Sequence, residues 1–184
     1  GVRAAGGREA GARMAGDVVY RREYAVGDLY MPQKQPRFPW HNRVVLMHRL
    51  RDGFRRPLLE RAQEIGAGLE WLRPAAKILA HAGSNAVDSV YEAIDEGRFG
   101  QEDISICVAL AIDPANGTFE LALENRGAGV SEEAFNIIGG GRRSPSTKDI
   151  GEFLGGRGEG FEHILDIARE AGFDVTLESN GRCF

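Results

Sequence analysis

Four polar side chains recur at helical spacing late in the first half of the chain: His81, Asn85, Asp88 and Glu92. Offsets of four, three and four residues stack them on one face of a helix. An imidazole can take a proton from water near neutral pH. An asparagine carbonyl can complete the oxygen shell of a Mg²⁺ ion that also holds phosphates. A solvent-facing stripe is the simpler explanation of the same pattern.

Two features favour a site over a solvated stripe. Gly83 and Ser84 lie in the middle of the predicted helix, where glycine costs about 1 kcal/mol relative to alanine. A glycine there makes sense if something packs closely against it. Asn85 is also a poor helix former, and it has no capping role in a helix interior.

Two glycine-rich motifs follow. Glu124-Asn-Arg-Gly-Ala-Gly-Val130 comes directly after a predicted strand, and its glycines permit a sharp turn close to a ligand. The segment 150–161 has five glycines that lead into a helix, where backbone N–H groups can cradle phosphate. It matches neither the Walker pattern nor the dinucleotide fingerprint. Between the motifs, residues 139–149 are Gly, Ser and basic, which is typical of a flap over an anionic ligand.

The remaining patterns supply the elements that would position these residues. We expect a helix from His41, broken around Gly53 and Pro57, and a second from about Pro74 to Glu96. Alternation predicts strands at 104–112 and 118–124, joined by an Asn-Gly hairpin. Then come a short helix at 131–138, a helix at 160–171 ended by Gly172, a strand at 173–179 and a last strand beginning at Phe184. This order predicts an α/β fold, a two-layer sandwich with helices on one face of a mixed sheet.

The domain organisation follows from composition. Residues 1–16 have little to bury and are expected to form a flexible extension, and the prolines in 17–42 indicate an extended, packed arm. The arm and first helix (17–73) and the region 74–184 should form one compact domain, which we expect to continue past Phe184. Six arginines between residues 43 and 61 indicate a solvated helix face or, less simply, a phosphate or partner patch.

Composition limits the function classes. The chain has 184 residues, a net charge of −4 and two cysteines, Cys107 and Cys183, without metal spacing. A cytoplasmic protein is expected, with no membrane span and no indication of nucleic acid as partner.

Taken together, the motifs resemble those of the GHKL superfamily, the ATP-binding fold of gyrase B, Hsp90, MutL and sensor histidine kinases. Ser84-Asn-Ala-Val-Asp-Ser89 is similar to its first box, Asn125-Arg-Gly-Ala-Gly-Val130 to its second and Gly156-Arg-Gly-Glu-Gly-Phe161 to its third. Ser144-Pro-Ser-Thr-Lys148 resembles the lid segment of the Hsp90 and MutL branches. The resemblance covers about residues 74–184 and implies a Bergerat-type fold.

The resemblance also implies a role for each matching residue. Asn85 would coordinate Mg²⁺ and through it the phosphates, and Asp88 would shape the base end of the site. The adenine pocket and the phosphate contacts would come from the following residues: Asn125, Gly127 and Gly129 for the base, and Lys148, Gly156, Gly158 and Gly160 for the phosphates.

Two positions depart from the family pattern. His81 stands where hydrolytic members have a general-base Glu, so it is the candidate base for ATP hydrolysis, and it could equally be inert. Asn125 stands where an Asp accepts a hydrogen bond from adenine, which weakens the expected bond and could suit guanine instead. Glu124, one residue earlier, should lie on the opposite face of its strand.

These residues predict a module that binds ATP with Mg²⁺ under a Gly/Ser/Lys lid, hydrolyses it slowly or not at all, and acts as a conformational switch. A further domain or protein partner would receive the signal. The sequence does not decide whether the arm at 17–42 is exchanged between two copies in a homodimer. The alternative is a degenerate GHKL-type scaffold with weak, absent or non-adenine nucleotide binding.

Overall fold

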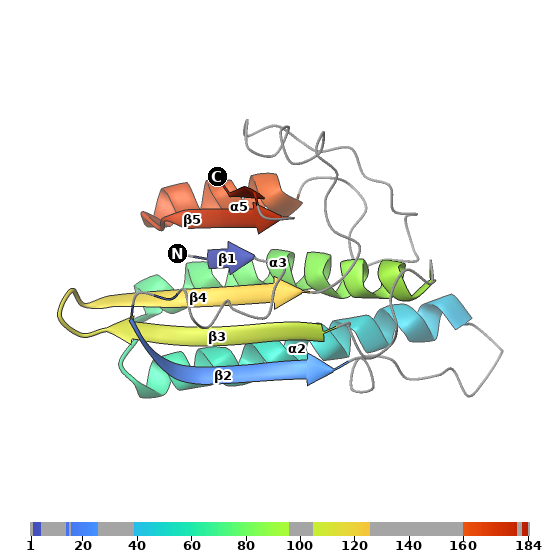
Figure 1. The fold of residues 1–184 in the computed structure, drawn as a ribbon, viewed down its shortest axis with the longest axis horizontal. Coiled ribbons are helices and arrows are strands. Elements are labelled where there is room, and N and C mark those ends of the chain that lie inside the picture. Colours follow the sequence, from blue (N-terminus) through green and yellow to red (C-terminus); the bar gives the residue numbers. More distant parts are fainter. Residues whose placement is uncertain are drawn as a thin grey trace.

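The computed structural model describes residues 2–4, 14, 16–25, 39–95, 105–125, 160–179 and 182–183. Its helices lie behind the strands in the view of Figure 1. The prediction of helices layered on a mixed sheet is confirmed at this level. In chain order the elements are β1 (Val2–Ala4), β2 (Asp17–Ala25), α2 (Pro39–Glu64), α3 (Leu69–Asp95), β3 (Ser105–Asp113), β4 (Thr118–Asn125), α5 (Gly160–Ala171), β5 (Val175–Ser179) and β6 (Arg182–Cys183).

The sheet has the strand order β2-β3-β4-β1-β5-β6. Neighbours β2, β3 and β4 are antiparallel, β1 is parallel to both β4 and β5, and β6 is antiparallel to β5. Strands β4 and β5 therefore point the same way, and α5 lies on the connection between them. Their carboxyl ends meet at one edge of the sheet, on the right in Figure 1.

The N-terminal region differs from the expected flexible extension. Val2–Ala4 form strand β1 in the middle of the sheet, where Val2 pairs with Leu121 on one side and Val175 on the other. Backbone hydrogen bonds to two neighbours hold this strand, so it needs little apolar side-chain surface. Within the predicted extended arm, Asp17–Ala25 is strand β2, which pairs with β3. The prolines at 32 and 36 lie outside the described residues.

Helix α2 is continuous, so the predicted break around Gly53 and Pro57 is wrong. Proline removes one helical hydrogen bond and normally costs about 3 kcal/mol. Phe54 and Leu58, which flank Pro57 on the core side, are both fully buried. Their burial stabilises the helix by about 1.5–3 kcal/mol each, enough to offset the proline.

Helix α3 begins at Leu69, five residues before the predicted start at Pro74. The N–H groups of Trp71 and Leu72 both donate to the carbonyl of Gly68, which forms the first turn. The Trp71 ring contacts Phe119 and Phe173, at centroid distances of 5.1 and 6.1 Å. This aromatic cluster anchors the extra turn to β4 and to the segment before β5.

The hairpin and the end of α5 are confirmed. Gly117 has φ +61° in the turn between β3 and β4, where Asp113 accepts hydrogen bonds from the N–H groups of Ala115 and Asn116. Helix α5 spans Gly160–Ala171 as predicted, and Gly172 ends it with φ +71°.

The core lies between the helices and the inner face of the sheet. Its fully buried side chains come from α2, α3, β3 and β4, and Ile164 and Ala168 of α5 complete it. No helix in the described part of the chain is long and apolar enough to cross a membrane.

Candidate functional site

The polar stripe on α3 is not a solvent-facing one. His81 and Asn85 are half-buried, and Asp88 is fully buried. The Nδ2 atom of Asn85 is itself buried and has no hydrogen-bond partner among the described residues. Leaving such a group unsatisfied costs about 1–3 kcal/mol. The Asn85 amide is therefore the side chain of α3 best suited to bind a ligand.

His81 lies between two other helices. Its ring meets that of His163 in α5 edge to face, with the centroids 5.0 Å apart and the planes at 62°. Burial lowers the pKa of His81, and electrostatic repulsion between its protonated ring and His163 and Arg51 lowers the pKa further. At pH 7 the imidazole is thus predominantly neutral, the form that can accept a proton. No carboxylate is among the groups that shift the pKa of His81.

The N-terminus of α5 lies level with Asn85. Helix α5 runs antiparallel to α3 (Figure 1), and His163 contacts His81. Both helices rise 1.5 Å per residue. Gly160, three residues before His163, is therefore level with Ser84, three residues after His81. The first N–H groups of a helix have no partner within it and attract anions. Those of α5 are level with the part of α3 that bears Asn85.

Asn125 is the last residue of strand β4, at the edge of the sheet where the carboxyl ends of β4 and β5 meet. Asn125 pairs with Ile106, whose side chain is fully buried in the core under the helices. Because alternate strand residues face alternate sides, Asn125 is on the helix side and Glu124 on the other. The expectation for Glu124 is borne out by this register. Asn125 is half-buried, at the carboxyl end of a strand that is parallel to its β1 neighbour.

The structure thus places Asn85 level with the start of α5 at Gly160, Asp88 about one turn further along α3, and Asn125 at the carboxyl end of β4. The other predicted site residues lie outside the described residues: Gly127, Gly129, Lys148, Gly156 and Gly158.

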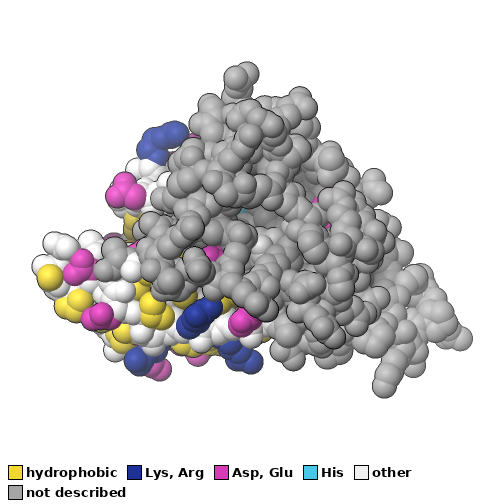
Figure 2. Space-filling model, in the orientation of Figure 1, with side chains coloured by type: hydrophobic (Ala, Val, Ile, Leu, Met, Phe, Trp, Pro, Cys, Tyr) yellow, Lys and Arg dark blue, Asp and Glu magenta, His cyan; other side chains and the backbone are white. Residues whose placement is uncertain are grey.

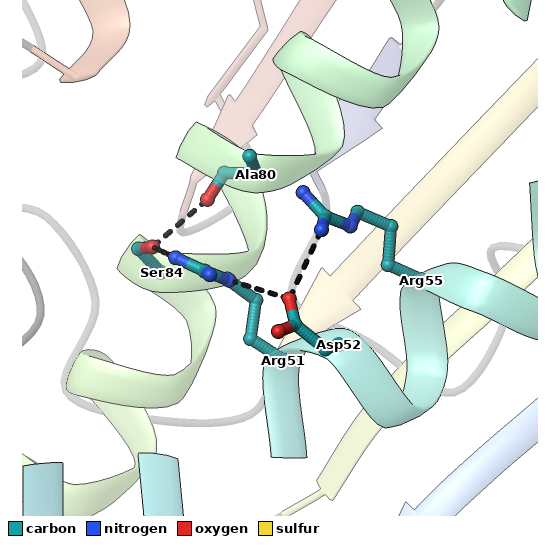
Figure 3. A network of polar contacts seen from close by, with 5 residues as sticks. All are labelled: Arg51, Asp52, Arg55, Ala80 and Ser84. Atoms are coloured by element: carbon teal, nitrogen blue, oxygen red, sulfur yellow. Dashed lines mark hydrogen bonds and ion pairs between the residues drawn. The ribbon is translucent and has the colours of Figure 1, made fainter. Parts of the chain in front are cut away.

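Gly83 and Ser84 have a packing role. A Cβ on Gly83 would stand 2.9 Å from Cζ of Phe54 and 3.0 Å from Cγ of Arg51. The absent side chain lets α2 approach α3. The Ser84 hydroxyl donates to the Ala80 carbonyl at 2.8 Å and accepts a hydrogen bond from Arg51 at 3.2 Å (Figure 3). The prediction that something packs closely here is right, and the close neighbour is α2.

Sequence reasoning missed two residues of this region, Arg51 and His163. Arg51 is one of six arginines in α2, and only the helix crossing distinguishes it from the others. The Asp52 carboxylate lies between Arg51 and Arg55, at 3.2 Å from Nε of Arg51 and 3.1 Å from the Arg55 guanidinium (Figure 3). His163 is the one histidine in α5, and its contact with α3 follows from the antiparallel packing of the helices.

Comparison of the chain with protein-family models, curated proteins and solved structures finds no match. The geometry around Asn85 therefore supplies the evidence on function.

The described side chains could supply only a small part of the ligands of a metal ion. In the described part of the chain, no group of three or more His, Cys, Asp and Glu side chains could hold a metal ion. Mg²⁺, however, usually keeps several waters and takes one or two protein ligands beside substrate phosphates. An asparagine amide can turn its oxygen toward such an ion. Asn85 fits this minor share of a Mg²⁺–phosphate shell.

Proposed function

We propose that this protein binds ATP with Mg²⁺ in a Bergerat-type, GHKL-like site at the carboxyl end of β4, between α3 and α5. The observation that supports the proposal is the buried Nδ2 atom of Asn85, which has no hydrogen-bond partner among the described residues and belongs to a residue level with the N-terminus of α5. Mg²⁺ bound by Asn85 would neutralise part of the phosphate charge. The N–H groups at the start of α5 would bind the phosphate oxygens.

Base recognition falls to Asn125 in this proposal. Its amide offers both a donor and an acceptor at the helix-facing side of β4. An amide oxygen accepts a bond from the adenine amino group, and the amide nitrogen could donate to the keto oxygen of guanine. The base preference is therefore a property to be measured with both nucleotides. Gly127 and Gly129 would line the base, and Lys148, Gly156 and Gly158 would contact the phosphates.

Hydrolysis is expected to be slow or absent. His81 is the candidate base, and its ring packs against His163 near Arg51. Burial, and repulsion from His163 and Arg51, disfavour the imidazolium that would form when His81 takes a proton from water. Binding without efficient turnover suits a conformational switch, in which closure of the lid signals to a further domain or partner.

Calorimetric titration of the protein with ATP and GTP, each with Mg²⁺, tests the binding proposal. Heat that saturates with one nucleotide is expected, and no heat at millimolar concentrations of either would leave the alternative, a degenerate scaffold. If binding is seen, steady-state turnover of wild type and His81→Ala tests the base. Unchanged turnover would remove His81 from the mechanism.

A further inference from the structure

A groove of about 520 Å³ runs between the second half of α2 and the first half of α3, on their solvent side. Its floor is apolar and half-buried and consists of Leu59, Leu72, Ala76 and Ala80. From residue 72 to residue 80 the α3 wall extends roughly 12 Å, or about two helical turns. This space suits a few apolar side chains of a short helical segment.

The rim of the groove is basic. Arg56, Arg73 and Lys77 are exposed, and within the described part of the chain none of the three forms an ion pair or a side-chain hydrogen bond. Arg55 also lines the groove and pairs with Asp52. Glu60 is the one acidic residue of the lining, so the groove has a net charge of +3.

This local charge contrasts with the net charge of the whole chain, which is −4. On the opposite side of the molecule, Figure 2 shows acidic and basic side chains interspersed over the coloured surface. In β2, exposed Arg21 and Glu23 lie on the face of the sheet that points away from the helices, because Tyr24, on the opposite face of the strand, is buried in the core. The groove is therefore a basic surface within a chain that is acidic overall.

We propose that the groove between α2 and α3 docks an acidic amphipathic helix of a partner protein. Apolar side chains of that helix would fill the floor at Leu59 and Leu72. Its carboxylates would pair with the three exposed cations of the rim. Charge complementarity favours an acidic occupant, and the apolar floor favours a peptide over nucleic acid, whose phosphates would leave Leu59 and Leu72 uncovered.

The groove is separate from the proposed nucleotide site. It ends at Ala80, and neither His81 nor Asn85 lines it. Peptide docking can therefore be measured without nucleotide, and its outcome is independent of ATP binding.

The experiment measures binding of a designed peptide of about 15 residues, long enough to form a marginal helix in water. Its leucines follow a spacing of three and four, and its other positions are mostly glutamate. Fluorescence anisotropy of the labelled peptide should show saturable, micromolar binding to the full chain that weakens with added salt. The charge reversal Arg73→Glu/Lys77→Glu should weaken it roughly tenfold or more. Arg73→Gln/Lys77→Gln should weaken it less.

The matched control is Arg21→Glu/Arg169→Glu, which makes the same charge change at exposed arginines outside the groove and should retain wild-type affinity. Melting curves by circular dichroism verify that each variant is folded. Absence of binding to wild type, or equal binding to the Arg73→Glu/Lys77→Glu variant, would overturn the inference. So would equal affinity for a peptide with serine in place of leucine. If a single-stranded oligonucleotide or phosphatidylserine vesicles bound more tightly than the peptide and lost that binding in Arg73→Glu/Lys77→Glu, the groove would be assigned to another ligand. That result would also overturn the inference.

Discussion

The imidazole rings of His81 and His163 meet edge to face, 5.0 Å between centroids, and connect the middle of α3 to the first turns of α5. Arg51 of α2 is close enough to His81 to lower its pKa. Three helices thus share one contact region one turn from Asn85. Protonation of both imidazoles would bring three cations together between these helices. The contact is favourable only while His81 stays neutral.

Stability is therefore expected to fall as the solution becomes mildly acidic. The pKa of His81 is lowered from 6.5 in the folded protein, so the unfolded chain binds the proton more readily. Folding stability from this group is fully present above pH 6.5 and is lost as the pH falls below it. Urea denaturation at a series of pH values should show this loss, and His81→Phe should reduce it. Exposed His48, changed to Gln, is the matched control. If the free energy of unfolding of His81→Phe fell with pH as steeply as that of wild type, His81 would not be the source of the pH dependence.

Arg51 should tune the pKa of His81. In Arg51→Met the apolar stem is kept and the charge is lost, so the pKa of His81 should rise toward its ordinary value. The lost hydrogen bond to Ser84 should also lower the free energy of unfolding by about 1 kcal/mol. Titration of the histidine ring protons by NMR measures the first effect. Arg56→Met, at an exposed position of the same helix, should leave the pKa of His81 unchanged.

Two glycines on neighbouring helices should respond oppositely to the same change. Gly83→Ala puts a Cβ 2.9 Å from the Phe54 ring, and we expect a loss of about 1–3 kcal/mol in the free energy of unfolding. Gly53→Ala meets nothing within 4 Å and should stabilise α2 by about 0.5–1 kcal/mol. Chemical denaturation of both variants measures these two changes in the free energy of unfolding. A stabilised Gly83→Ala would mean that the two helices are not so close.

The sequence predicts those elements whose signals are local. The Asn116-Gly117 turn and the end of α5 at Gly172 depend on backbone conformations that glycine favours, and both are found as expected. The alternating strands β3 and β4 also follow from local pattern.

The errors arise where tertiary packing decides. Pro57 is tolerated in α2 because Phe54 and Leu58 are buried, and Trp71 extends α3 through contacts with Phe119 and Phe173. Strand β1 depends on backbone pairing with β4 and β5, which leaves no pattern in its side chains.

The candidate site likewise has features that follow from local sequence pattern and features that depend on tertiary packing. Helical spacing predicts that His81, Asn85 and Asp88 share one side of α3. The contacts of His81 with Arg51 and His163 depend on helix packing and could not be read from spacing. Gly83 signals a close approach, but the sequence does not say whether a ligand or another helix approaches it.

The most direct test of nucleotide binding is the Mg²⁺ dependence of ATP affinity in wild type and Asn85→Ala, measured by calorimetry with and without a chelator. The matched control is Asn116→Ala, which makes the same truncation in the exposed β3–β4 turn. We predict that Mg²⁺ strengthens ATP binding to wild type and to the control. Asn85→Ala should lose about 1–3 kcal/mol of binding free energy in Mg²⁺ and most of the metal dependence. Equal ATP affinity of Asn85→Ala and wild type in Mg²⁺ would contradict a site built around Asn85.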